Sequence, residues 1–152
     1  MKNNTNKIDI RNKKAFFDYE IIEKFDAGIV LLGTEIKSIR ESKVSFTDAF
    51  CIVIANEMWL KGLHISEYTH GNLNNHIPKR DRKLLLNSKE IKKISNKVKE
   101  KGYTIVPLKV FINENGFAKV EIALARGKAQ HDKRDTLKTK DAKREIERGA
   151  KF

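Results

Sequence analysis

GYTIVPLKVFINENGFAKVEIALA, residues 102–125, contains two runs in which apolar residues alternate with other residues, separated by a polar turn sequence. In the first run the alternating residues are Val106, Leu108, Val110 and Ile112, and in the second they are Val120, Ile122 and Leu124. A period of two places such residues on one face of a strand. Asn115 and Gly116 between the runs are typical of a tight hairpin turn. The stretch therefore predicts an antiparallel pair, 103–112 with 117–125, in which Pro107 marks an edge position or a bulge.

A helix is predicted immediately before this hairpin. Asn87 can cap its start while Glu90 reaches back three residues, and Gly102 supplies the stop. Ile91, Ile94 and Val98 form one apolar face at helical spacing.

The earlier half of the chain contains further short β-rich runs. Residues 19–25 and 29–32 predict a first antiparallel pair, with a turn at 26–28, and a short helix follows from its N-cap candidate Thr34 to about Arg40. Residues 50–54 and 58–65 predict a hairpin, followed by a long polar loop, 66–83. About six short strands and two or three short helices, without βαβ alternation, predict a mainly β fold, a small antiparallel barrel. By analogy we favour the oligonucleotide-binding type; a sandwich is the alternative.

The chain is strongly basic, with a net charge of +12 at pH 7. A surplus of this size points to nucleic acid or an anionic membrane as partner. Membrane is the weaker option, because the longest apolar run, 49–55, is far shorter than the roughly 20 residues of a span. The first residues lack the apolar core of a signal peptide, so we expect a cytoplasmic protein.

Both ends of the chain are polar and basic. Residues 1–14 predict a flexible basic arm, residues 15–125 the barrel domain, and residues 126–152 a basic tail. The tail has too few apolar residues to order itself alone, yet Ala142, Ile146 and Ala150 recur at helical spacing. We therefore expect it to be disordered when free and to fold on a polyanion.

No pattern of catalytic or metal-binding residues emerges. His64, His70 and His76 are six residues apart, which matches no common zinc spacing, and the lone Cys51 in an apolar run predicts a buried side chain. No carboxylate cluster of the kind that a metal-dependent nuclease needs is evident, so a nuclease is kept only as an alternative interpretation. A general RNA-binding barrel is a second alternative. The sequence predicts no catalytic residue, no metal and no cofactor.

Candidate RNA contacts come from charge and from aromatic rings. The loop ends in the basic cluster Lys79, Arg80, Arg82 and Lys83, which together with the tail offers phosphate-binding charge. Phe16, Phe17, Tyr19, Tyr68 and Tyr103 are candidates for stacking on unpaired bases. We expect Phe46, Phe50, Trp59 and Phe111 to belong to the core instead.

Several ordered motifs resemble one known family. GIVLLGTEIKSIR (28–40), RKLLLN (82–87), GYTIVPL (102–108), RGKAQHDKRDTLK (126–138) and AKREI (142–146) are together similar to the SsrA-binding protein (SmpB) family. The resemblance runs collinearly from about Asn12 to the C-terminus.

This resemblance implies a bacterial RNA-binding protein that acts in trans-translation, the rescue of stalled ribosomes, and catalyses no reaction itself. Its implied partners are the tRNA-like domain of transfer-messenger RNA (tmRNA), the decoding region and message channel of the ribosome, and elongation factor Tu in the delivered complex. The tail would become helical in the vacant message channel.

Carried over by position, the resemblance also implies specific contact residues. The implied RNA contacts are Asn12, Leu85, Lys119, Gly127 and Lys128, with Asp26 at the family's acidic position. Lys83, from the basic cluster at the end of the loop, is added to the predicted RNA-binding residues because of its charge. The implied ribosome-contacting residues of the tail are His131, Asp132, Lys133 and Arg134. Lys138, Lys143 and Arg144 are added because of the basic character of the tail, which suits ribosomal RNA phosphates. Asp26 departs from the family pattern, which has Glu before the Ala-Gly pair.

Overall fold

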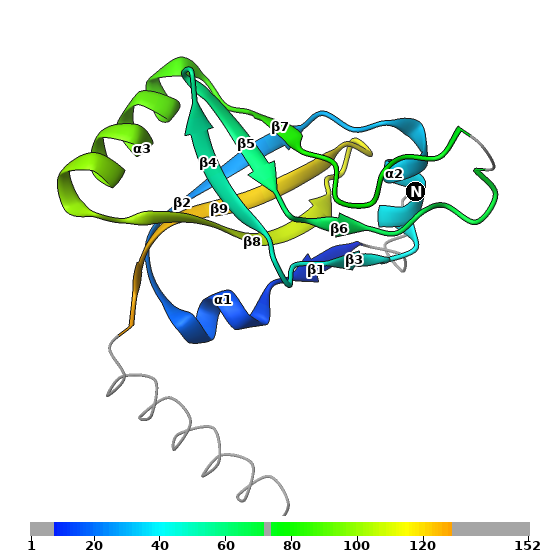
Figure 1. Cartoon of the computed structure of the whole chain (residues 1–152), viewed down its shortest axis with the longest axis horizontal. Coiled ribbons are helices and arrows are strands. Elements are labelled where there is room, and N and C mark those ends of the chain that lie inside the picture. The colour runs from blue at the N-terminus through cyan, green and yellow to red at the C-terminus, as the bar shows by residue number, and fades with distance from the viewer. Residues whose placement is uncertain (1–7, 72–73, 129–152) are drawn as a thin grey trace, which may run out of the picture.

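Nine strands and three helices make up the computed structural model, which describes residues 8–71 and 74–128 (Figure 1). In chain order they are β1 (Asp9–Arg11), α1 (Lys13–Asp18), β2 (Tyr19–Ile29), α2 (Gly33–Arg40), β3 (Val44–Ser45), β4 (Phe50–Ile54), β5 (Glu57–Lys61), β6 (His64–Ile65), β7 (Arg82–Leu85), α3 (Ser88–Lys101), β8 (Thr104–Ile112) and β9 (Ala118–Gly127).

Seven of the strands form one curled sheet in the order β1-β8-β9-β2-β7-β5-β4, and every recorded pairing is antiparallel. The sheet curls until β4 approaches β8, which closes it into a barrel-like shape around a single apolar core. α3 covers one end of this barrel (Figure 1). The prediction of a mainly β, small antiparallel barrel is confirmed, with β3 and β6 as an additional two-stranded ribbon.

The hairpin predicted from residues 102–125 is confirmed as β8 and β9. Gly116 ends the turn with a φ of 85°, a left-handed conformation that glycine adopts without steric cost. The register shifts between Pro107 and Lys109, so the proline lies at a bulge, as its missing N–H donor predicts.

The predicted turn at residues 26–28 is wrong, because β2 runs through it without a break. Asp26, Ala27 and Gly28 pair with consecutive residues of β9, and Ala27 is buried in the core. β9 is ten residues long and offers a partner along nearly the whole of β2. Tertiary pairing of this kind overrides a local preference for a turn. The irregularity of β2 lies instead between Ile21 and Glu23, where the register shifts.

Two other boundaries differ from the prediction. Thr34 lies inside α2 and does not cap it; the Glu35 carboxylate accepts the Leu32 N–H instead, at 2.7 Å. The strand predicted over 58–65 ends at Lys61, because Gly62 adopts a φ of 77° and its Cα lies too close to the Asp48 carbonyl for a side chain.

The N-terminal arm is shorter than predicted. Residues 9–11 form β1, which pairs with the edge of β8, and Asn12 caps α1. The assignment of residues 9–14 to a flexible arm is therefore wrong: an open sheet edge offers backbone partners that a polar composition does not reveal. Residues 1–7 and 129–152, and the predictions made for them, lie outside the described residues.

Among the predicted core residues, Cys51 is buried, whereas Phe50 next to it is 47% exposed on the outer side of β4. Alternation along a strand accounts for this difference, because neighbouring side chains point to opposite faces. Phe46 packs against the core, and Phe111 and Trp59 are half-buried. Burial raises the pKa of the Cys51 thiol far above its usual range, so this cysteine is not a nucleophile.

The predicted helix is confirmed as α3, with both of its end signals. The Asn87 side chain accepts the Glu90 N–H at 2.9 Å, the Glu90 carboxylate accepts the Asn87 N–H, and Gly102 ends the helix with a left-handed φ of 70°.

We expect Asn87→Ala to lower the free energy of unfolding by about 1 kcal/mol, because the helix loses its N-cap acceptor. Chemical denaturation of the wild-type protein and the variant measures this difference. Asn96→Ala is the control, since this exposed residue lies within α3 and is expected to change stability by less than about 0.5 kcal/mol. Equal effects of the two substitutions would contradict the capping role.

Candidate nucleic-acid interface

A row of side chains crosses the outer face of the sheet near one end of β2. Gly28 lies between Leu85 of β7 and Lys119 of β9, and Phe111 of β8 is the next partner along the row. Directly paired residues point to the same face of a sheet. Leu85 is 51% exposed, and a Cβ built on Gly28 would touch the Cβ of Leu85 at 3.4 Å. Because Gly28 has no side chain, Leu85 and Lys119 are the nearest side chains on either side of it in this row.

Asp26 lies in the next row of the same face, directly opposite Glu121 of β9. Like charges in directly opposed positions repel each other. An exposed carboxylate in this place cannot attract phosphate, but it can accept hydrogen bonds from base edges or ribose hydroxyl groups. Asp26 is exposed, so the carboxylate is available at the surface as an acceptor.

α1 lies over the remaining part of this outer face. Its Ala15 is buried in a second apolar cluster with Val106, Leu108, Ala123 and Ala125. The neighbouring Phe16 ring is exposed, and the Lys24 ammonium group lies 5.9 Å from its centroid. An aromatic ring beside a cation provides both a stacking surface and a phosphate-binding charge.

The chain leaves the barrel just beyond α1. Gly127 pairs with Tyr19 at the end of β9, and the Lys128 N–H donates to the Asp18 carbonyl at 3.0 Å. A Cβ built on Gly127 would meet no atom of the chain, so its own fold does not require a glycine here. Gly127 and Lys128 thus lie at the far end of the outer face that holds Leu85 and Lys119.

We call this surface the β2–β9 face and define it by Phe16, Lys24, Asp26, Gly28, Leu85, Phe111, Lys119, Gly127 and Lys128. Five of the residues predicted to bind RNA lie on it: Asp26, Leu85, Lys119, Gly127 and Lys128. Phe16 is the stacking candidate that joins them.

Asn12 has a structural role at the other end of α1. Its side-chain amide donates to the Pro107 carbonyl at 2.9 Å, and its oxygen accepts the Ala15 N–H at 3.3 Å. Asn12 therefore joins the start of α1 to the bulge of β8. Both polar ends of the side chain are engaged within the protein, so an RNA contact by this residue remains a prediction.

Lys83 and the rest of the basic cluster 79–83 make internal ion pairs. Lys83 binds Glu57 at 2.9 Å, and Lys79 binds Asp48 at 2.7 Å. Arg80 and Arg82 both bind Glu35, and Arg82 also donates to the Leu63 and Pro78 carbonyls. The interpretation of this cluster as a free phosphate-binding surface is wrong for Arg82, which is 0% exposed.

Glu35 is the acidic centre of this arrangement and is also fully buried. Burial alone would raise the pKa of its carboxyl group. Hydrogen bonds from Arg80 and from the Leu32 N–H, together with the Arg82 charge, outweigh burial and hold the pKa below its usual value. Glu35 is therefore ionised at neutral pH and ties α2 to β7.

The residues of the β2–β9 face that sequence reasoning missed are Lys24, Gly28 and Phe111. Lys24 belongs to the segment read as the first strand of a pair, and Phe111 was assigned to the core. Their position depends on the register of β2 and β8 against β9, because that register determines which residues share a face. Strict alternation with Asp26 along β2 is the one local signal that marks Lys24 as outward-facing.

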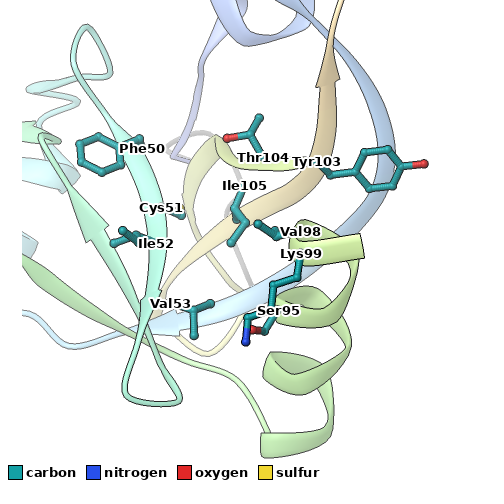
Figure 2. A pocket seen from close by; sticks show the side chains of 10 residues that line it. All are labelled: Phe50, Cys51, Ile52, Val53, Ser95, Val98, Lys99, Tyr103, Thr104 and Ile105. Carbon is teal, nitrogen blue, oxygen red and sulfur yellow. The ribbon is translucent and has the colours of Figure 1, made fainter. Parts of the chain in front are cut away.

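A cavity of about 390 Å³ opens elsewhere, between β4, β8 and α3 (Figure 2). Its walls are mainly apolar, and Ser95 and Lys99 of α3 lie along one side. Within residues 8–71 and 74–128, no three His, Cys, Asp or Glu side chains come together as a metal site would require, and no helix is long and apolar enough to cross a membrane.

Comparison with known proteins agrees with this geometry. Residues 9–152 match the family described as SmpB protein. The SsrA-binding protein of Parabacteroides distasonis is 54% identical over 97% of this chain and 96% of its own length, and that of Bacillus cytotoxicus is 54% identical over 97% and 95%. A solved structure described as "tmRNA-SmpB: a journey to the center of the bacterial ribosome" has a TM-score of 0.69 and 44% identity, over 86% of this chain and 94% of its own.

A small antiparallel barrel with lysines and an exposed aromatic ring on one outer face defines a nucleic-acid-binding protein of the β-barrel class. Similarity of sequence and of structure extends over most of the chain. The chain belongs to the SmpB family, the SsrA-binding proteins.

Proposed function

We propose that the protein binds the tRNA-like domain of tmRNA and brings it to stalled ribosomes for trans-translation. The observation that carries this proposal is the β2–β9 face, where Leu85, Gly28 and Lys119 form one row beside an exposed carboxylate and a cation–aromatic pair. The names of the relatives and of the similar structure support the choice of RNA and of the ribosome.

Each group of the face has a defined role in this proposal. Lys24, Lys119 and Lys128 bind phosphates, and Phe16 and Leu85 supply surfaces for unpaired bases or ribose. Asp26 accepts hydrogen bonds from the RNA. Lys83 is not part of the defined face, and its ammonium group would have to leave Glu57 to bind RNA. Asn12 would act mainly by positioning α1.

The tail has a separate role in the proposal. The segment beyond residue 128 would enter the vacant message channel, with His131 in the decoding region and the cationic tail residues against ribosomal RNA phosphates. Elongation factor Tu would accompany the complex, the setting would be the cytoplasm, and the protein itself would catalyse no reaction. This assignment rests on the family and on the tail's ten basic against five acidic residues.

A chain ending at Gln130 tests the two roles separately. We expect it to bind the tRNA-like domain within about three-fold of the full chain at 0.15 M salt, because the β2–β9 face is retained and long-range attraction by the tail is largely screened. We also expect it to lose peptide tagging in a reconstituted stalled-ribosome assay.

Two results would contradict the proposal in different ways. If the truncated chain binds an unrelated RNA hairpin as tightly as the tRNA-like domain, the β2–β9 face is not the specific site. If it supports tagging as well as the full chain, the tail has no role in the message channel. A full chain in which the tail residues are kept but their order is scrambled controls for net charge.

A further inference from the structure

α3 carries the highest density of unpaired positive charge in the part of the chain that the structure describes. Its sequence SKEIKKISNKVKEK contains six lysines and two glutamates. Lys93 pairs with Glu23, but no carboxylate or ring partner is recorded for Lys89, Lys92, Lys97, Lys99 and Lys101. The basic cluster 79–83, in contrast, is neutralised within the fold.

The lysines of α3 lie on two different flanks of the helix. Ile91 and Ile94 face the core, and Lys93, Lys97 and Lys101 follow one another at steps of four residues, along one side. Lys93 binds Glu23 at 2.7 Å, which places this side next to β2. Lys92 and Lys99, seven residues apart, share the opposite side, where Lys99 borders the cavity against β4 (Figure 2).

The flank next to β2 lies at the end of the barrel, across β2 from Lys24, because Lys93 binds Glu23 and neighbouring residues of a strand point to opposite faces. Glu23, the partner of Lys93, directly precedes Lys24 of the face. At the other end of the helix, Lys101 leads through Gly102 into β8, whose Thr104 pairs with Ala125, two residues before Gly127. One end of the ladder formed by Lys93, Lys97 and Lys101 is therefore ion-paired to β2, and the other end leads into β8, the strands that carry Lys24 and Phe111 of the face.

The spacing of these lysines is unfavourable for the helix alone and favourable for binding a chain of phosphates. Successive members are about 6 Å apart along the axis, and like charges at that spacing repel each other. The partial negative charge at the helix C-terminus attracts the Lys101 ammonium group, but it attracts Lys99 on the opposite flank equally. This attraction therefore does not distinguish the two flanks. A polyanion lying along the β2 flank would remove the repulsion, and the adjoining face is where the proposed function places an RNA.

We infer that Lys97 and Lys101 bind backbone phosphates of the RNA held on the β2–β9 face, so that the α3 flank extends the RNA-binding surface. This inference rests on the proposed function for the identity of the RNA. It assigns a binding role to residues outside the set implied by the resemblance to the family.

Two double variants of the full chain provide a matched test. Lys97→Gln/Lys101→Gln removes two charges from the β2 flank, and Lys92→Gln/Lys99→Gln removes two from the cavity flank. Each pair includes one lysine of the last turn, and glutamine is close to lysine in helix propensity. Affinity for the tRNA-like domain is measured from 50 to 200 mM salt, with an unrelated hairpin of equal length in parallel. Thermal unfolding verifies that both variants are folded.

We expect the Lys97/Lys101 variant to bind the tRNA-like domain about ten-fold more weakly at 0.1 M salt and to reduce the slope of log affinity against log salt by about two. The Lys92/Lys99 variant should stay within about two-fold of wild type.

An unchanged Lys97/Lys101 variant, or equal losses in both variants, would overturn the inference and leave the proposed function intact. If wild type binds the hairpin as well as the tRNA-like domain, the proposed function fails, while a selective loss in the Lys97/Lys101 variant would still support the phosphate contacts.

Discussion

Glu35→Gln is expected to lower the free energy of unfolding by about 3–5 kcal/mol, the range observed when one member of a buried ion pair is removed. The substitution keeps the shape of the side chain but leaves the fully buried Arg82 guanidinium without its counter-ion. It also removes the partner that orders Arg80 and thereby the segment between β6 and β7. Chemical denaturation monitored by Trp59 fluorescence measures the loss.

Glu57→Gln is the matched control, because the Glu57–Lys83 pair is half-exposed on both sides. Pairs of that kind contribute at most about 1 kcal/mol. Equal losses for Glu35→Gln and Glu57→Gln would show that the buried arrangement is not the element that holds α2 to β7.

The pH dependence of the Glu35 effect follows from the sign of its pKa shift. The folded-state pKa lies below the ordinary value of about 4.3, so ionised Glu35 stabilises the fold fully above that pH. This contribution falls as the pH drops through the folded-state pKa. The difference in stability between wild type and Glu35→Gln should therefore be largest near neutral pH and should narrow in acid.

Lys24→Glu/Lys119→Glu is expected to weaken binding of the tRNA-like domain by about 100-fold or more at 0.1 M salt. Each reversal removes one phosphate contact and adds a repulsive charge in the middle of the β2–β9 face. Both side chains project from the outer side of the sheet, so the core stays intact. Titration of labelled RNA, repeated across a salt series, gives both the affinity and the number of phosphate contacts.

Lys61→Glu/Lys79→Glu serves as the control for net charge. These lysines pair with Asp81 and Asp48, outside the β2–β9 face. We expect this variant to keep RNA affinity within about five-fold of wild type at 0.15 M salt, where distant charges are largely screened. A loss as large as that of the Lys24/Lys119 variant would indicate diffuse attraction to a basic protein and would contradict a defined site.

Charge counted along the sequence is a poor guide to which cations of this protein are engaged in internal ion pairs. The cluster at residues 79–83 has the densest charge before the tail, yet its members are neutralised by Asp48, Glu35 and Glu57, which are distant in sequence. Lys119 is isolated in the sequence and stands between two apolar residues of β9, yet no internal anion is recorded for it among the described residues. Long-range ion pairing, which no local pattern encodes, decides the difference.

The sequence by itself determined the features that depend on neighbouring residues. The β8–β9 hairpin follows from alternation and a turn at Gly116, the bulge follows from Pro107, and both ends of α3 follow from Asn87 and Gly102. Alternation of apolar residues and capping are local, so a single sequence reveals them. The mainly β class follows from the same local patterns and the basic character follows from composition, whereas the barrel was favoured over a sandwich by analogy.

Only the tertiary structure decided which residues share a surface. β2 became one strand because β9 offered it a partner along almost its entire length, and that register placed Lys24, Asp26 and Gly28 on the outer face beside Lys119 and Leu85. A shift of one residue would have turned each of them into the core. β1 likewise formed because β8 had an open edge. Backbone pairing and burial join residues far apart in the chain, and for that reason the β2–β9 face is a property of the fold.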